Sequence, residues 1–171
     1  MYYFEGFTKA LYNVDGGIEW TLVTDIFKRV RIRTNIKENV VLLDPYDIND
    51  SDTPEAVAQR HHGSVEYYWV VLLTNGITDP FHDWPLSSRQ FNSFVIDKYG
   101  STLEDVHHYE IYQTSGDTTQ TIEVENTTYP TATGISNYSY EFKLNESKRQ
   151  ISLLRNEYLG QFVDEFQRIV S

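Results

Sequence analysis

The chain has 171 residues, 40% of them hydrophobic, which is enough for one substantial core and argues against disorder. Its net charge of −11 argues against nucleic acid or an anionic membrane surface as the main partner, because both would repel it. The absence of cysteine excludes a disulfide framework and thiolate chemistry, and favours synthesis inside a cell. The start lacks a basic region, and no apolar run approaches the roughly 20 residues of a membrane span, so we expect neither a secretory signal nor a transmembrane segment.

The first part of the chain, residues 1–43, is predicted to be an extension with a strand and a basic segment. Residues 1–7 are interpreted as a short strand, and Asp15-Gly16-Gly17 as a turn. A helical turn or extended segment follows Thr24-Asp25. Its polar side carries a basic cluster, which is conspicuous in an acidic chain: Lys28, Arg29, Arg31 and Arg33. The cluster is either a solvated face of mixed charge or a contact patch for an acidic surface.

Residues 52–76 contain the start and stop signals of two short helices. Thr53 is a suitable cap for the first helix, Pro54 fits its first position, and Gly63 offers the left-handed residue that ends it. Ser64 then caps the second helix, and Asn75-Gly76 closes it. Strand material precedes the pair at 40–43 and 46–48, with Asp44-Pro45 as an interruption.

The second of these helices is apolar on nearly every side. Tyr67, Tyr68 and Trp69 occupy successive positions and cover most of its circumference, so the helix is buried within its own fold or against another chain. The segment 79–85 after it is predicted to be a rigid corner. Its two prolines favour extended conformations before them, and Phe81 and Trp84 can hold the segment against the helix pair.

The rest of the chain mixes predicted helices and strands. A helix is expected over 86–99, capped by Ser87 or Ser88 and ended by Gly100. The Ser/Thr-rich stretch 114–136 is expected to be a loop or protruding hairpin, and the alternation from Tyr138 to Leu144 predicts a strand. A further strand at 150–154 precedes a terminal amphipathic helix. Its apolar stripe consists of Leu159, Phe162, Val163, Phe166, Ile169 and Val170.

Aromatic residues make up 15% of the chain, more than one core of this size usually needs. Tyr and Trp are enriched in interfaces because they combine a large apolar face with a polar group, so some of these residues are expected to face partners. For any single aromatic residue, a place on a strand is an equally good interpretation.

The residues that carry chemistry do not form a recognisable catalytic or metal-binding motif. Adjacent histidines, as in His61-His62 and His107-His108, point about 100° apart on a helix, so neither pair chelates a metal alone. A calcium loop beginning at Asp47 fails because Asp52 and Ala58 stand where Gly and Glu are needed. We therefore expect no metal, no cofactor and no enzymatic activity.

The helix pair resembles the helical half of a LysM module, in which an Asp-Thr start, a small residue in the first helix, a Gly stop and a closing Asn-Gly recur. With Tyr67-Tyr68-Trp69, the continuation Ile77-Thr78-Asp79-Pro80-Phe81-His82-Asp83-Trp84-Pro85-Leu86-Ser87 resembles the baseplate wedge protein 53 family of contractile-tailed phages. That family carries a LysM-like fold. The resemblance covers about 44–100 and extends to 140–151 with the closing helix. After the glycine that corresponds to Gly63, members of the family commonly have Asn or Asp and then Pro. This chain has Ser64-Val65 there, which still allows capping of the second helix.

The resemblance implies an α+β fold: a LysM-like βααβ core, extra β-strands or a hairpin, and a C-terminal amphipathic helix. Four parts are then expected. They are the N-terminal extension (1–43), the LysM-like module with its aromatic corner and following helix (44–113), the Ser/Thr-rich loop or hairpin (114–136), and the final strands and helix (137–171).

The resemblance also implies a structural virion protein of the tail baseplate, made in the host cytoplasm and present in several copies around the tail axis. The implied partners are other baseplate wedge proteins, a sheath-initiator-like protein, and tail hub or tube proteins. The candidate interface residues are Tyr67, Tyr68, Trp69, Phe81, Trp84, Lys28, Arg29, Arg31, Arg33, Phe162 and Phe166.

The alternative function is binding of peptidoglycan or another N-acetylglucosamine glycan. Free-standing LysM modules bind such polymers in a shallow groove between two loops, which here correspond to residues 49–54 and 75–79. Phe81 and Trp84 follow the second loop, where they either stack on sugars or fill the groove. The sequence leaves both possibilities open.

Overall fold

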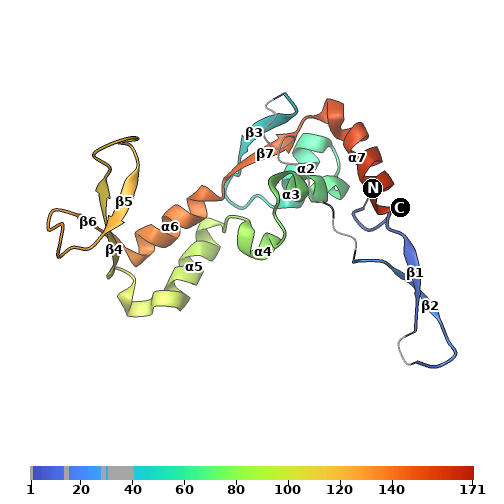
Figure 1. Cartoon of the computed structure of the whole chain (residues 1–171), viewed down its shortest axis with the longest axis horizontal. Helices are drawn as coiled ribbons and strands as arrows, with labels where there is room; N and C mark the ends of the chain where they lie inside the picture. Colours follow the sequence, from blue (N-terminus) through green and yellow to red (C-terminus); the bar gives the residue numbers. More distant parts are fainter. Residues whose placement is uncertain (1, 14–15, 28–29, 31–40) are drawn as a thin grey trace. The chain divides into compact units, whose positions relative to one another are not determined.

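The computed structural model describes residues 2–13, 16–27, 30 and 41–171 (Figure 1). Helices and strands are mixed along the chain, which confirms the α+β class. The chain forms two compact units. Unit 1 comprises Met1–Trp84 and Gln150–Ser171, and unit 2 comprises Pro85–Arg149.

Unit 1 is built around two antiparallel strands that are far apart in the sequence. Strand β3 (Leu43–Asp47) pairs with β7 (Gln150–Leu154), so that Leu43 lies opposite Leu154 and Asp47 opposite Gln150. Pro45 lies within β3 and does not interrupt it. A two-stranded sheet leaves one side of β3 without a neighbouring strand, and there the missing proline N–H costs no ladder bond.

Between these strands the chain forms the helix pair that its capping residues predict. Helix α2 (Pro54–His62) begins after Thr53, whose Oγ1 accepts a hydrogen bond from the Ala56 amide at 3.2 Å, and it ends at Gly63 with φ of 78°. Ser64 caps a short 3₁₀ turn, η1 (Val65–Tyr67), which leads into α3 (Tyr68–Asn75). Gly76, with φ of 70°, ends α3. A side chain at either glycine would be strained in this left-handed conformation.

The order β3, α2, α3, β7 is the strand–helix–helix–strand order that the resemblance implies. The likeness to LysM itself stays a prediction. The second strand is β7, outside the range 44–113 expected for the module, because residues 76–149 lie between α3 and β7 in the sequence.

Asn75, the last residue of α3, binds this distant strand directly. Its Nδ2 donates to the carbonyl oxygens of Val71 at 2.8 Å and Ser152 at 2.9 Å, and its Oδ1 accepts from the Ser152 amide at 2.8 Å. The side chain therefore satisfies both peptide groups of Ser152, and it attaches β7 to α3.

Two clusters of buried side chains form the core of unit 1, and α3 contributes to both. Trp69 and Val70 pack into the cluster that includes Phe7, Leu43 and Phe166. Val71 packs into a second cluster, which consists of Ile48, Val57, Ala58, Val71, Trp84, Ile151 and Leu153. A helix between two apolar clusters must be apolar on opposite sides, which explains its composition. The terminal helix α7 (Asn156–Val170) covers the first cluster with Phe166 and Val170. Figure 1 shows α2, α3 and α7 grouped beside β3 and β7.

The N-terminal strand predicted over residues 1–7 is wrong. Residues 3–6 form turns, with the Glu5 amide bonded to the Tyr2 carbonyl and the Phe7 amide to the Phe4 carbonyl. Tyr3 and Phe7 both pack against Phe166, with ring centroids 5.3 and 6.0 Å away. The strands lie further along, as the hairpin of β1 (Lys9–Tyr12) and β2 (Thr21–Thr24).

Unit 2 contains two helices and a three-stranded antiparallel sheet. Helix α5 (Ser88–Tyr99) begins with a capping box between Ser87 and Gln90, and the short turn η2 (Gly100–Thr102) follows it. The sheet order is β5 (Thr121–Val124), β4 (Val106–Tyr112), β6 (Thr133–Ser136). The stretch expected to be a loop or hairpin thus contributes two strands.

The strand predicted at 138–144 is also wrong, because these residues lie in α6 (Asn137–Ser147). Apolar residues at every second position also place Tyr138 and Phe142 four residues apart, on one helix face. Both rings pack against Phe91 of α5, at 5.6 and 5.9 Å between centroids. The Ser136 hydroxyl caps the helix by accepting from the Ser139 amide.

Glu141 and Asn145 contribute to the polar contacts that hold α6 to the rest of unit 2. Glu141 is buried, and its Oε1 accepts from Lys98 Nζ at 2.6 Å and from the Tyr99 hydroxyl at 2.8 Å. Asn145 bonds both backbone groups of Leu86, through Oδ1 at 2.7 Å and Nδ2 at 3.1 Å. Among the described residues, no helix combines the length and apolar character needed to cross a membrane.

Candidate protein interface

Three of the aromatic residues predicted for an interface are core residues of unit 1. Trp69, Trp84 and Phe166 are only 3%, 7% and 2% exposed. The rings of Trp69 and Phe166 pack against each other in a tilted arrangement, with centroids 4.5 Å apart. Their surfaces are covered within the unit, so these three side chains support the fold.

The other predicted candidates have different environments. Tyr67, Tyr68 and Phe162 are half-buried and pack against the core clusters. Phe81 is 87% exposed, on the single helical turn α4 (Pro80–Asp83). The basic cluster at 28, 29, 31 and 33 lies outside the described residues, so its role stays a prediction.

Trp84 occupies the region where the LysM resemblance implies a groove. Its indole Nε1 donates to the Asp52 carbonyl at 2.7 Å, and its ring belongs to the second core cluster. The loop it contacts is itself ordered by the Asp52 carboxylate, which accepts from the Tyr46 hydroxyl, the Asn49 amide and Arg60. These bonds lower the pKa of Asp52, against the effect of its burial. Trp84 therefore fills space beside residues 49–54 and is not a free stacking surface.

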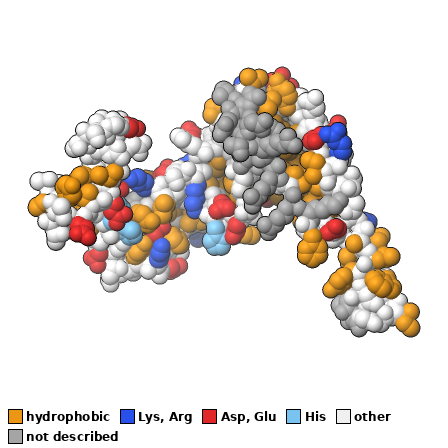
Figure 2. Space-filling view, viewed as in Figure 1, with side chains coloured by type: hydrophobic (Ala, Val, Ile, Leu, Met, Phe, Trp, Pro, Cys, Tyr) orange, Lys and Arg blue, Asp and Glu red, His pale blue; other side chains and the backbone are white. Residues whose placement is uncertain are grey.

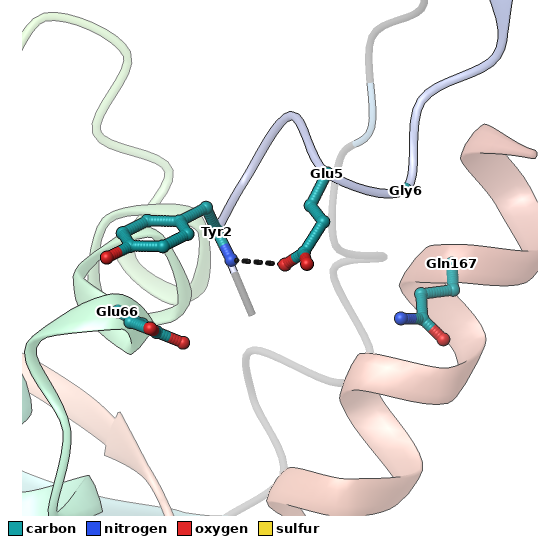
Figure 3. Close-up of a pocket in the computed structure, with 5 residues that line it drawn as sticks. All are labelled: Tyr2, Glu5, Gly6, Glu66 and Gln167. Carbon is teal, nitrogen blue, oxygen red and sulfur yellow. Dashed lines mark hydrogen bonds between the residues drawn. The ribbon is translucent and has the colours of Figure 1, made fainter.

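A polar cavity of about 420 Å³ lies near the N-terminal turns (Figure 3). Tyr2 and Glu5 form one side, where the Tyr2 amide donates to Glu5 Oε2 at 3.1 Å, and Glu66 and Gln167 lie on the other walls. These groups can hydrogen-bond, but the set contains no nucleophile paired with a base. A second cavity, of about 320 Å³, is mainly apolar and lies beside α3 and Tyr3.

Glu110 of β4 forms one charged contact within its own strand, with His108, and another with Lys143 of α6. Glu110 Oε1 lies 3.0 Å from His108 Nε2 and 3.1 Å from Lys143 Nζ. The hydrogen bond from His108, with help from Lys143, lowers the pKa of Glu110 to about 2. Over the described residues, no three His, Cys, Asp or Glu side chains are grouped so as to hold a metal ion.

Exposed apolar side chains gather on the β1–β2 hairpin, which the sequence reasoning missed. All of its strand residues are exposed or half-exposed. Figure 2 shows hydrophobic side chains over it. The exposed apolar residues on and beside the hairpin are Leu11, Tyr12, Ile18, Trp20, Leu22, Val23, Ile26 and Phe27.

A signal for this hairpin was present in the sequence. The Gly16-Gly17 turn was identified, and apolar residues flank it at 10–12 and 20–23. Residues 2–7 are richer in aromatics, which favours a strand there in the sequence pattern. In the structure, Phe7 is buried in the core of unit 1 and Tyr3 packs against it, while Tyr2 and Phe4 are exposed.

Comparison with known proteins gives the same family as the sequence motifs. The family model for base plate wedge protein 53 matches residues 4–131, three-quarters of the chain. The baseplate wedge protein gp53 of Enterobacteria phage T4 is 24% identical over 164 residues, covering 86% of this chain and 84% of that protein. The chain belongs to the base plate wedge protein 53 family and is a structural protein of the phage virion, in the tail baseplate.

Proposed function

We propose that this protein joins neighbouring baseplate wedge subunits to one another and to the sheath-initiating layer through protein–protein contacts. The observation that carries the proposal is the apolar β1–β2 hairpin. The proposed partners are other wedge proteins, a sheath-initiator-like protein, and hub or tube proteins, with several copies of the chain around the tail axis.

The hairpin presents apolar side chains on both of its faces. Leu11 lies opposite Leu22 on one face, and Ala10 lies opposite Val23 on the other, because neighbouring residues of a strand point in opposite directions. A lone two-stranded hairpin is marginally stable in water, and an apolar patch of this kind is typical of an interaction site. A partner that covers the hairpin would support its two strands and would also remove its apolar side chains from water.

The base of the hairpin is attached to the core of unit 1. The Thr8 amide donates to the Val170 carbonyl at 3.3 Å, and the Asp25 amide donates to the Thr8 carbonyl at 2.9 Å. A bound hairpin would therefore transmit its position to α7 through the backbone. With a chain charge of −11, a neutral or basic protein surface is the favoured partner.

Glycan binding, the alternative, finds less support. A glycan in the LysM-type groove would need the space beside residues 49–54 that Trp84 fills. Phe81 remains as an exposed aromatic ring near the second loop, so a glycan titration that includes a Phe81 variant tests this alternative.

The test of the proposed function replaces both hairpin leucines, Leu11→Ser with Leu22→Ser, in a phage whose own copy of the gene is removed. Both side chains are well exposed, so thermal unfolding should change little. Incorporation of the chain into baseplates, measured by quantitative mass spectrometry of purified particles, should fall at least tenfold. Thr21→Ser, a conservative change at the same hairpin, is the matched control. Normal incorporation of a folded double variant would contradict the proposal.

A further inference from the structure

The single turn α4 is fixed at its beginning by a compact set of bonds around Asp79. One carboxylate oxygen of Asp79 accepts from the Phe81 amide at 3.0 Å, and the other lies 2.7 Å from His82 Nδ1. The Asp79 amide donates to Asp83 Oδ2 at 3.3 Å, and the Asp83 amide donates to the Asp79 carbonyl at 2.8 Å. The side chains of Asp79 and Asp83 thus close the turn from both ends.

Trp84 fixes the turn to the core immediately after it ends. Its indole is buried against Ile48, Val57 and Ala58, and its Nε1 is bonded to the loop at Asp52. The turn is therefore closed by the bonds around Asp79 and held to the core through Trp84. Pro80 restricts it further, because its ring fixes φ.

Phe81 extends from this fixed turn into solvent, with 87% of its surface exposed. Burial in the monomer does not explain an aromatic ring at this position. A ring on a rigid support loses little conformational freedom when it binds, so it can contribute strongly to an interface. Trp84 thus anchors the turn to the core, while Phe81 on the same turn is left exposed to solvent.

The surroundings of Phe81 are acidic. Asp79 and Asp83 are both exposed and lie two residues before and after it, with His82 bonded to Asp79. That bond lowers the pKa of Asp79, which therefore stays ionised at neutral pH. Asp52, whose carbonyl accepts from Trp84, is already paired with Arg60. A partner surface complementary to this region would carry positive charge around an apolar pocket.

We propose that Phe81 is a docking knob that inserts into an apolar pocket rimmed by Lys or Arg side chains on a neighbouring protein of the baseplate. The inference rests on the proposed function and adds a second contact, separate from the hairpin. The ring supplies apolar burial, and the two carboxylates orient the contact through charge pairs.

The probe is the set of wedge assemblies purified from cells infected with phage that lacks this gene. Binding of the labelled full-length protein is followed by fluorescence anisotropy at low and moderate salt. Phe81→Ala should weaken binding at least tenfold without changing thermal unfolding, while Phe81→Tyr, which keeps the ring, should bind normally. Asp83→Asn keeps an oxygen for the Asp79 amide but removes the charge. It should therefore reduce the salt dependence of binding.

The outcomes separate this inference from the proposed function. Normal binding of Phe81→Ala, with loss of binding by the hairpin double variant, overturns the knob and leaves the proposed function in place. Normal binding by both variants overturns both. Unchanged salt dependence in Asp83→Asn overturns the basic rim. Saturable binding of a chitin hexamer by the unaltered protein, lost in Phe81→Ala, would assign the ring to glycan and overturn the docking role.

Discussion

At the scale of single residues, two asparagines perform the same task in the two units. Asn75 bonds both backbone groups of Ser152, and Asn145 bonds both backbone groups of Leu86. An amide side chain has a donor and an acceptor in the spacing of a peptide group, so it can replace a strand neighbour. Each asparagine thereby satisfies polar groups that would be costly to leave unpaired when partly buried.

His62 is a residue whose protonation state follows from its neighbours. Asn156 donates from Nδ2 to the His61 carbonyl at 2.6 Å, so its Oδ1 is the atom that faces His62 Nδ1 at 2.9 Å. The Nδ1 atom must then carry the proton. The other ring nitrogen, Nε2, is buried without a hydrogen-bond partner among the described residues. A second proton on this ring would therefore be unpaired.

We predict that His62 makes stability depend on pH. Burial lowers its pKa below the ordinary 6.5, the nearby His61 adds to this, and the bond to Asn156 opposes it. Its contribution to stability is thus complete above pH 6.5 and is lost as pH falls through the lowered pKa, because the unfolded chain takes up the proton first. Urea unfolding at pH 7.5 and pH 5 checks this. His62→Gln should lose less stability than the unaltered chain over that range, and an equal loss in both would contradict the assignment.

At the scale of elements, α7 shows that one apolar stripe contains residues of very different burial. Phe166 contacts the rings of Tyr3, Phe7 and Trp69 and is 2% exposed, while Ile169 is 50% exposed. The helical period predicts which residues share a face, and the packed neighbours decide how deeply each is buried.

This gradient predicts graded costs of truncation along α7. Phe166→Ala should lower the free energy of unfolding by about 3–5 kcal/mol, because it removes a large ring from a packed core. Phe162→Ala, at a half-buried position, should cost less. Ile169→Ala, the exposed control, should stay within about 0.5 kcal/mol. Equal costs for Phe166 and Ile169 in urea titrations would show that the helix packs differently.

At the scale of the whole molecule, unit 2 is inserted into unit 1. The chain leaves unit 1 after Trp84 and returns at Gln150 to add β7 beside β3. Within unit 2, the bonds between Asn145 and Leu86 join residues near its two ends. Because its own hydrogen bonds bring its two ends together, unit 2 does not need unit 1 to hold those ends.

We predict that residues 85–149 fold as a separate fragment. Urea unfolding followed by circular dichroism should show one cooperative transition. Asn145→Ala should lower the stability of the fragment by about 1–3 kcal/mol, since it leaves the Leu86 backbone groups without their partner. Asn92→Ala, on the exposed surface of α5, is the matched control and should have little effect. A fragment without a cooperative transition would refute the independence of unit 2.

The sequence by itself determined the features that depend on neighbouring residues. Thr53, Gly63 and Gly76 mark helix ends because capping and left-handed backbone are local preferences. The motif around residues 77–87 was sufficient to identify the family, which the family model confirms. The amphipathic stripe of α7 was also readable, because helical periodicity extends over only a few residues.

The tertiary structure alone decided pairing, burial and exposure. The alternation at 138–144 fits a strand or a helix, and the contacts of Tyr138 and Phe142 with Phe91 select the helix. Trp84 and Phe81 are equally aromatic in the sequence, yet one is buried and the other is exposed. The pairing of β3 with β7 joins segments about a hundred residues apart. Such outcomes depend on contacts between distant residues, and local sequence preferences do not contain the energies of those contacts.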